Sequence, residues 1–452
     1  MLREACGIAG VWNIDRAYNI LHDILLGLQH RGQESAGVVV GNFETVKGMG
    51  LVEETIKSER YIPGDRGIGH VRYSTVGASA QRNIQPIIAQ TRKGLMGVAH
   101  NGTLPDADYW KNWLMEMGHI FLTETDSELF LHLISSSPFE KAQDAIIWTL
   151  QQIKCAYSLI LYHKDFIAIA RDGFGIRPLF WGRFENGFVM ASEDAALRVI
   201  GAEDISEVPP GTVIFFERDK EPYSISFSNL PKRVCSFEYI YFARPDSTFD
   251  GLNIHKARFN MGKILYQESH LEGDIVVPVL DSGISGALGF SYASGIPIDL
   301  GLMRNRYLGR SFIMPSKRSE TVRRKLLPIP EVVSGKRVIV IDDSIVRGTT
   351  MNVIVRMLRE SGAKEVYVAI HSPPVKFSCF YGIDTARRSE LAASSQSIEE
   401  LKEAVGADKL VYLSIEGLKR ALEGRSACFA CFEGRYPHEE SSCIGVGERI
   451  KL

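Results

Sequence analysis

One segment limits the possible folds of this chain more than any other: an apolar run that ends in two adjacent carboxylates. Val338–Ile341 is continuously apolar, Asp342 and Asp343 follow directly, and small and hydroxyl side chains then lead to Thr349 and Thr350. A strand that is apolar throughout is typically buried on both faces, as in a parallel sheet covered by helices. The segment therefore predicts a strand, a loop and the start of a helix in an α/β domain.

The rest of the second half continues this alternation. Ile275–Leu280 and Val366–Ile370 are further apolar strands, residues 282–294 are compatible with a helix, and Gly362 suits a helix end. One helical face is formed by Met351, Ile354, Val355 and Leu358. We expect a parallel sheet with helices on both faces. A capping box at Ser397–Glu400 predicts one more helix.

The first half has a different pattern, with short strands mixed with helices. We expect strands at 35–41, 67–72, 156–163 and 165–170 and helices at 107–117 and 126–135, which is typical of antiparallel sheet packed with helices. The polar stretch 219–233 contains two prolines. We place the domain boundary there, so that a prefix, 1–5, is followed by domains at 6–230 and 231–452.

Charge and composition exclude several classes of protein. The 452 residues allow two or three domains, and a net charge of −2 provides no overall field to attract nucleic acid or membrane. No apolar run approaches the length of about 20 residues that spans a bilayer, and no signal core opens the sequence. We expect a cytoplasmic protein without nucleic-acid or membrane partners. Seven scattered cysteines argue against a disulfide framework and leave catalytic or metal-binding roles.

Cys6, near the start of the chain, is a candidate nucleophile. If the five preceding residues are removed, its own α-amine can accept the thiol proton and no histidine is needed. A buried structural cysteine is the alternative. Polar clusters elsewhere in the first half supply the other groups that amide hydrolysis needs: an arginine for a carboxylate, an aspartate for an ammonium, and amide N–H groups for an oxyanion. They are His30–Gly37, Gly69–Thr75, His100–Gly102 and Thr125–Glu128.

The loop after Val338–Ile341 is a candidate phosphate site. Loop N–H groups, Thr hydroxyls and the helix N-terminus favour an anion, and the adjacent carboxylates favour Mg²⁺ or two ribose hydroxyls. An acidic turn that caps the helix is the alternative. Val279–Gly283 follows another strand and could hold pyrophosphate at Asp281, with the Ser282 hydroxyl on the metal. Residues 304–325 carry eight Lys or Arg and one Glu. Such a run is usually a solvated basic face, but beside a pyrophosphate-bearing substrate we expect a cationic loop that closes over it.

Together, Cys6–Gly10 and the four polar clusters resemble the class II glutamine amidotransferases, which are N-terminal-nucleophile hydrolases with an αββα sandwich. The resemblance implies that Cys6 is the nucleophile, Arg72 binds the glutamine carboxylate and Asp126 its amino group, while Asn101 and Gly102 form the oxyanion hole. Arg171–Leu179 and Ala191–Glu193 also match the family, and we interpret both segments as mainly structural.

The second half resembles the type I phosphoribosyltransferases, and the combination resembles the amidophosphoribosyltransferases. These enzymes transfer ammonia from glutamine to phosphoribosyl pyrophosphate in the first committed step of purine synthesis. The resemblance implies Mg²⁺ contacts at Ser282, Asp342 and Asp343. It implies substrate phosphate contacts at Ser344, Ile345, Val346, Arg347, Gly348, Thr349 and Thr350. It also implies a homotetramer inhibited by purine nucleotides such as AMP, ADP or GMP.

Four cysteines from three segments could surround one metal centre: Cys235, Cys379, Cys428 and Cys431. Spacing alone does not separate a [4Fe–4S] cluster from zinc. The flanking sequences resemble the ligand segments of the iron–sulfur class of amidophosphoribosyltransferases, which implies a structural [4Fe–4S] cluster. Cys155 is then expected in the core, and Cys443 competes with Cys428 or Cys431 as a ligand.

Two other functions remain as alternatives. Another class II amidotransferase, such as a glucosamine-phosphate synthase, would need a sugar-isomerase half, and the loop at Asp342–Asp343 argues against it. A non-catalytic regulator that senses the substrate would need neither Cys6 nor the residues expected to bind the amide substrate.

Overall fold

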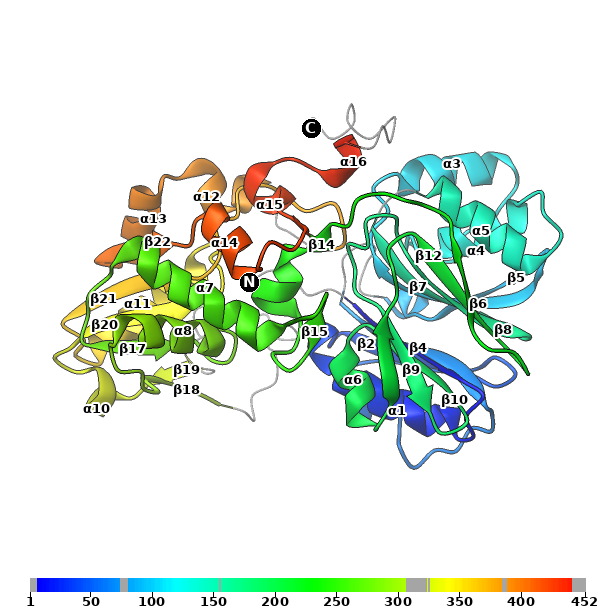
Figure 1. Cartoon of the computed structure of the whole chain (residues 1–452), viewed down its shortest axis with the longest axis horizontal. Coiled ribbons are helices and arrows are strands. Elements are labelled where there is room, and N and C mark those ends of the chain that lie inside the picture. The colour runs from blue at the N-terminus through cyan, green and yellow to red at the C-terminus, as the bar shows by residue number, and fades with distance from the viewer. Residues whose placement is uncertain are drawn as a thin grey trace.

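The computed structural model describes residues 6–73, 80–153, 156–305, 323, 326–383 and 388–440. The prefix 1–5, Cys155, Cys443 and nearly all of the basic run 304–325 lie outside these ranges. The described chain forms two lobes that meet along a central junction (Figure 1). Residues from β1 to β13 build one lobe, and the parallel sheet with its helices builds the other.

Two stacked sheets form the first lobe, and both are built from antiparallel pairs. The first sheet has the order β11 (Glu203–Glu207), β9 (Phe180–Phe184), β10 (Gly187–Ala191), β1 (Gly7–Trp12), β4 (Arg66–Arg72), β2 (Ser35–Val40) and β3 (Glu44–Met49). The second has the order β13 (Tyr223–Ser226), β12 (Thr212–Glu217), β8 (Phe166–Arg171), β7 (Tyr157–His163), β6 (Gly94–Gly102) and β5 (Ile87–Thr91).

Alternation of side chains along the strands explains the layers of this lobe. On β1, Ile8 and Trp12 pack between the sheets with Ile160 and Ile169 of the second sheet. Ala9 and Val11 face the other way, toward the helical layer. That layer contains α1 (Ala17–Gly27), α2 (Val52–Thr55) and α6 (Asp194–Val199), and the outer face of the second sheet carries α3 (Ala107–Glu116), α4 (Glu128–Ser136) and α5 (Ala142–Gln152). The αββα sandwich expected from the sequence is confirmed.

The second lobe has a four-stranded parallel sheet, as predicted. Its order is β17 (Ile275–Pro278), β20 (Arg337–Asp342), β21 (Glu365–Ile370) and β22 (Lys409–Tyr412). Alternate residues of β20 enter two different cores, so both faces are buried. One face is covered by α7 (Ile254–Ser269) and α8 (Ile284–Ser294), and the other by α11 (Thr349–Glu360) and α13 (Ile398–Val405).

Two local sequence predictions for this lobe are also confirmed. The apolar face of α11 is buried, and Ser397 and Glu400 form the expected capping box at the start of α13. Shorter elements complete the lobe: β18 (Leu302–Arg304), β19 (Leu326–Pro328), α10 (Pro330–Val333), η4 (Arg388–Glu390), α12 (Ala392–Ser395), α14 (Ile415–Ala421), α15 (Ala430–Glu433) and α16 (Pro437–Glu440).

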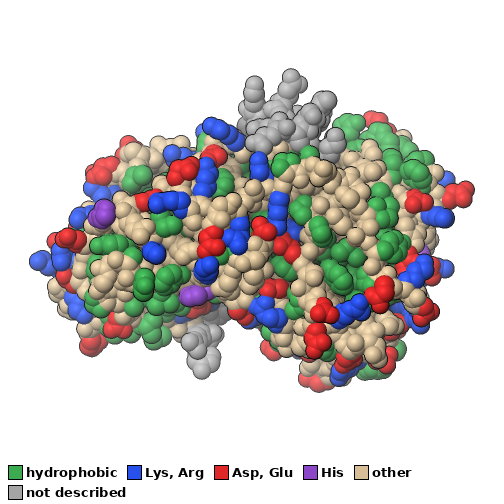
Figure 2. Space-filling model, in the orientation of Figure 1, with side chains coloured by type: hydrophobic (Ala, Val, Ile, Leu, Met, Phe, Trp, Pro, Cys, Tyr) green, Lys and Arg blue, Asp and Glu red, His purple; other side chains and the backbone are tan. Residues whose placement is uncertain are grey.

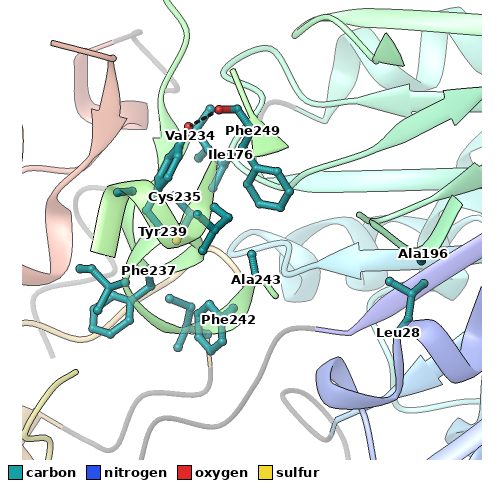
Figure 3. Close-up of a cluster of buried hydrophobic side chains, with 14 of the residues drawn as sticks. Leu28, Ile176, Ala196, Val234, Cys235, Phe237, Tyr239, Phe242, Ala243 and Phe249 are labelled. Carbon is teal, nitrogen blue, oxygen red and sulfur yellow. Dashed lines mark hydrogen bonds between the residues drawn. The ribbon is translucent and has the colours of Figure 1, made fainter. Parts of the chain in front are cut away.

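The junction between the lobes is a continuous apolar core. The π-helical turn η3 (Glu238–Phe242) follows β14 (Val234–Cys235), which pairs in parallel with β23 (Ala427–Cys428). Phe237 packs against Phe242, while Tyr239 packs against Phe249 of β15 (Thr248–Phe249) and donates its hydroxyl hydrogen to the Phe249 carbonyl (Figure 3). The core therefore ties η3 firmly to both lobes.

The surface gives no sign of one dominant charge. Acidic and basic side chains are interspersed over both lobes on the face that Figure 2 shows. Within the described residues, no helix is both long and apolar enough to span a bilayer.

Candidate active sites

Cys6 lies at the start of β1 and is buried. Its Sγ donates a hydrogen bond to the Tyr73 carbonyl at 3.5 Å. Burial raises the pKa of the Cys6 thiol, while the bond to Tyr73 and the nearby charge of Arg72 oppose the rise. A thiol with a raised pKa is a weak nucleophile until a base takes its proton. The site therefore requires a base next to Cys6.

Most of the residues expected to act on glutamine meet in one small cavity. Its cavity volume is only about 10 Å³. Three strand ends and two loops contribute its walls, so positions far apart in the sequence become neighbours. The lining residues are Cys6, Arg72, Tyr73, Gln85, His100, Gly102, Thr125, Asp126 and Ser127. His100 and Ser127 belong to polar clusters expected from the sequence, although no role was assigned to either. Gln85 was not singled out, because a single polar residue in a turn carries no signal of its own.

Charged groups in this cavity are held by specific partners. Arg72 Nη1 donates to Glu34 Oε1 at 2.9 Å, and the Arg72 side chain is only 3% exposed. Asp126 Oδ2 accepts from the Leu104 N–H at 2.8 Å, and its Oδ1 lies 3.7 Å from His100 Nδ1. The Arg72 cation and the Asp126 anion thus line the same small cavity. They could bind the α-carboxylate and the α-ammonium group of an amino acid.

Asn101 and Gly102 end β6 beside this cavity. Asn101 is fully buried, and neither atom of its side-chain amide has a hydrogen-bond partner among the described residues. Gly102 has a φ of +149°, and a Cβ there would stand 2.2 Å from the Ala156 carbonyl oxygen, so only glycine fits. Gly102 lines the cavity, whereas Asn101 is not among the lining residues. An unpartnered amide can donate to an oxyanion.

A second site lies at the carboxyl edge of the parallel sheet. β17 and β20 are neighbours, with Pro278 opposite Ile341, so the loops that follow them emerge side by side. The Val279 N–H donates to the Ile341 carbonyl at 2.9 Å, and Gly283 packs against that same carbonyl. The Asp281–Ser282 loop and the Asp342–Thr350 loop are therefore brought together, as open α/β sheets do at their ligand sites.

The carboxylates of this edge are held in a confined space. Burial, and secondarily the negative charge of Asp343, raise the pKa of Asp342 well above its usual value. Asp343 accepts a bond from Ser344 Oγ at 2.5 Å, and Asp281 is paired with Arg304. Two crowded carboxylates of this kind favour a bound cation or hydroxyl donors.

A cavity of about 610 Å³ adjoins the start of α11. Its walls come from the loop before the helix, one side of the helix, and α13. The residues that line it are Arg347, Gly348, Thr349, Thr350, Asn352, Val353, Arg356, Gln396, Leu401, Ala404 and Val405. The backbone N–H groups of a helix start, beside two arginines, suit phosphate. Ile345 and Val346 are buried apolar residues of the same loop and contribute backbone and packing.

The four candidate cluster cysteines converge at the junction between the lobes. Cys235 and Cys428 face each other across the β14–β23 pair, and none of the four thiols is in a disulfide within the described ranges. Burial raises the pKa of Cys431 far above its usual value, and the other three thiolates add to the rise, so the four lie within electrostatic reach. Even so, no group of three or more His, Cys, Asp or Glu in the described ranges has the spacing of a metal site.

A buried ionic network joins the two lobes near Cys6. Arg31 Nη1 donates to Glu193 Oε1 at 2.6 Å, and Arg31 Nη2 donates to Glu238 Oε1 at 2.7 Å. Arg177 Nη1 donates to the same Glu238 oxygen at 3.0 Å. All four side chains are fully buried. Sequence reasoning treated Arg177 and Glu193 as structural and missed Glu238, since nothing in a single charged residue indicates a partner 207 positions away.

The fold and these two sites define a class of protein: an N-terminal-nucleophile amidotransferase joined to a phosphoribosyltransferase domain. Family models agree, since the glutamine amidotransferase domain matches residues 70–199 and the phosphoribosyl transferase domain matches residues 252–372. The presence of the second domain excludes the sugar-isomerase alternative.

Whole-chain comparisons are more specific. The amidophosphoribosyltransferase of Bacillus subtilis is 45% identical, with 97% of this chain and 95% of that protein covered. The enzyme of Methanocaldococcus jannaschii is 42% identical, covering 96% and 98%. The solved structure of the glutamine phosphoribosylpyrophosphate amidotransferase from B. subtilis, in complex with ADP and GMP, superposes with a TM-score of 0.90 at 44% identity, covering 96% and 97%. The chain belongs to the amidophosphoribosyltransferase family.

Proposed function

We propose that this protein hydrolyses glutamine at Cys6 and uses the released ammonia to displace pyrophosphate from phosphoribosyl pyrophosphate. Glutamine and water give glutamate and ammonia, and ammonia then gives 5-phosphoribosylamine and pyrophosphate. The observation that carries the proposal is the cavity in which Cys6, Arg72, Gly102 and Asp126 meet. Family membership supports the coupling of this cavity to a phosphoribosyltransferase site and places the reaction at the start of purine synthesis.

In the first half-reaction, each residue has a distinct role. The α-amine of Cys6, freed by loss of the prefix 1–5, takes the thiol proton and supplies the base that a buried thiol needs. Arg72 exchanges part of its contact with Glu34 for the glutamine carboxylate, and Asp126 receives the α-ammonium. Asn101 Nδ2 and the Gly102 N–H stabilise the oxyanion of the tetrahedral intermediate.

In the second half-reaction, the Ser344–Thr350 loop binds phosphate and the Asp342–Asp343 pair binds the ribose hydroxyls. The crowded, partly desolvated carboxylates fit a cation, and Ser282, Asp342 and Asp343 would hold Mg²⁺. When bound there, Mg²⁺ would supply positive charge to offset that of the leaving pyrophosphate. Asp281 and the N–H groups of its loop orient that pyrophosphate.

The four converging cysteines support a structural [4Fe–4S] cluster. Cys235, Cys428 and Cys431 are buried and Cys379 is partly buried, and the Tyr381 N–H donates to Cys379 Sγ at 3.3 Å, a contact common around thiolate ligands. Cys235, Cys379, Cys428 and Cys431 would hold the cluster, which would pin the C-terminal segment to the junction. With the proposed boundary between domains 6–230 and 231–452, all four cluster ligands belong to the second domain.

Regulation and assembly are proposed on the same basis. The similar B. subtilis structure is a complex with ADP and GMP, and a further structural neighbour is described as the allosteric regulatory enzyme of purine biosynthesis. We therefore expect inhibition by purine nucleotides, a homotetramer in solution and a cytoplasmic location, without nucleic-acid or membrane partners.

Two variants test the proposed function together. Cys6→Ala should abolish synthesis from glutamine but still release pyrophosphate when ammonium salt at alkaline pH supplies free NH₃. Asp342→Asn should fail with either nitrogen donor, because the phosphoribosyl substrate and Mg²⁺ lose their anchor. Pyrophosphate release and glutamate formation are measured in parallel for both proteins.

Each half of the proposal can fail separately. Glutamine-dependent synthesis by Cys6→Ala would remove Cys6 as the nucleophile. Near-normal turnover by Asp342→Asn would place the phosphoribosyl site elsewhere.

A further inference from the structure

The backbone of Gly382, in the second lobe, lies directly against the backbone of Gly102 in the first. A methyl group added at Gly382 would stand 2.9 Å from both the carbonyl carbon and the Cα of Gly102, closer than real Cβ contacts. Gly382 also has a φ of +99°. The turn that contains Gly382 therefore fixes the position of a glycine that lines the glutamine cavity.

Arg177 holds this turn from the side of the first lobe. Its Nε donates to the Tyr381 carbonyl at 3.0 Å, one residue before Gly382. Its Nη1 donates to Glu238 Oε1, also at 3.0 Å. The guanidinium thus clamps two segments of the second lobe at once, the Tyr381–Gly382 turn and η3.

Glu238 reaches the nucleophile through a second arginine. Two nitrogens of Arg31, Nη1 and Nη2, donate to the two carboxylate oxygens of Glu238 at 3.0 and 2.7 Å. Arg31 Nε then donates to the Cys6 carbonyl at 3.1 Å. A single carboxylate from the second lobe therefore orients both the main chain of Cys6 and the clamp on Gly382.

The charges make this arrangement stiff. Glu238, Arg31 and Arg177 are all fully buried. Arg31 has Glu193 as another carboxylate partner, whereas Arg177 relies on Glu238 as its carboxylate partner in the described part of the chain. Removing one member of a buried ion pair leaves an uncompensated charge, so the native geometry is strongly preferred while the pair is intact.

We propose that Glu238 and the Tyr381–Gly382 turn are positioning elements of the glutaminase site, contributed by the phosphoribosyltransferase domain. The first domain supplies the groups that touch glutamine. The second domain holds two of them, Cys6 and Gly102, in their positions in the site. The inference rests on the proposed roles of Cys6 and Gly102. It means that the glutaminase site is complete only when the second domain is docked.

The first test is Gly382→Ala in the full-length protein. The methyl group should displace Gly102 and lower kcat for glutamine hydrolysis about 100-fold, as expected for small misplacements of a catalytic group. The KM for glutamine should change little, because Arg72 and Asp126 are untouched, and ammonia-dependent synthesis should stay normal. Gly335→Ala is the matched control, since Gly335 also has a positive φ of +71° but nothing within 4 Å of its Cβ position.

The second test is Glu238→Gln, which keeps the shape and removes the charge. Glutamine-dependent kcat should again fall while ammonia-dependent synthesis persists. Glu207→Gln is its control: Glu207 pairs with the buried Arg171 at 2.6 Å and accepts the Asp250 N–H at 3.0 Å, but it contacts neither Cys6 nor the turn. It should lower the melting temperature comparably and leave glutaminase kcat unchanged.

The outcomes separate the inference from the proposed function. If Cys6→Ala behaves as expected while Gly382→Ala and Glu238→Gln retain normal glutaminase kcat, only the positioning role is lost. Equal losses in each variant and its control would show general destabilisation and would also overturn it. A selective loss of glutaminase kcat in Gly382→Ala alone, should Glu238→Gln not fold, is sufficient support.

Discussion

Asn101→Ala should separate catalysis from stability more cleanly than any other single change in this protein. Asn101 is fully buried on β6, and its amide makes no hydrogen bond within the described residues. Most buried polar side chains are partnered, so the unpartnered Asn101 amide, one residue before the cavity-lining Gly102, is available to a transient ligand. We expect a large loss of glutaminase activity with almost no loss of stability.

The magnitudes follow from the contacts. An unpartnered buried amide costs about 1–3 kcal/mol of folding free energy, and Ala removes that cost. The deleted atoms leave a small void worth about 1 kcal/mol in the opposite direction. The free energy of unfolding should thus stay constant or rise slightly. Loss of one oxyanion donor costs about 3–4 kcal/mol in the transition state, so kcat should fall about 10²–10³-fold.

The assay is glutamate release at saturating glutamine, together with a urea unfolding curve for the same preparation. Asn253→Ala provides the opposite pattern as a control. Asn253 caps α7, with its side chain accepting from the Lys256 N–H at 3.1 Å. Loss of such a cap costs about 1 kcal/mol and should leave glutaminase kcat unchanged.

An Asn101→Ala protein that is clearly less stable yet turns over glutamine normally would refute the reasoning. The amide would then be a structural group with a partner in the folded protein, and the oxyanion donor would have to be found elsewhere in the cavity.

Three further predictions concern processing, the cluster and pH. Active enzyme should begin at Cys6 by intact mass, and full activity with the prefix attached would contradict the amine base. Anaerobically purified protein should contain about four irons per chain, and Ser in place of any ligand, but not of Cys443, should remove them; stoichiometric zinc would contradict the cluster. Burial lowers the pKa of His70 from 6.5 to about 3. Its contribution to stability is therefore complete above pH 6.5 and falls as the pH drops, by up to about 1.4 kcal/mol per pH unit. His70→Gln should flatten that slope in urea midpoints between pH 6.5 and 4, and an unchanged slope would show that His70 is not its source.

Much of the fold follows from local signals in the sequence. The apolar run before Asp342 specifies a buried parallel strand, because a strand covered by helices on both faces is apolar at successive positions rather than at alternate ones. The spacing of Met351, Ile354 and Leu358 specifies a helix, and the capping box at Ser397 specifies where another begins. Motif order in the first half likewise indicated the amidotransferase class.

Other features depend on contacts between residues far apart in the chain. The meeting of Cys6, Arg72 and Asp126 requires the stacking of two sheets, which no local pattern encodes. The partner of Arg72 in this structure, Glu34, was not anticipated either. The domain boundary at 219–233 and the roles of the individual site residues stay predictions.

By itself, the sequence determined the elements, the two fold classes and the residue types available for chemistry, since these depend on periodicity and short motifs. Only the tertiary structure decided which charges share a buried space. Glu238 is an ordinary acidic residue in the sequence, yet in the folded chain it lies between Arg31 and Arg177 with no exposed surface. A buried charge is tolerated only with a partner, and such a partner is chosen by packing in three dimensions rather than by distance along the chain.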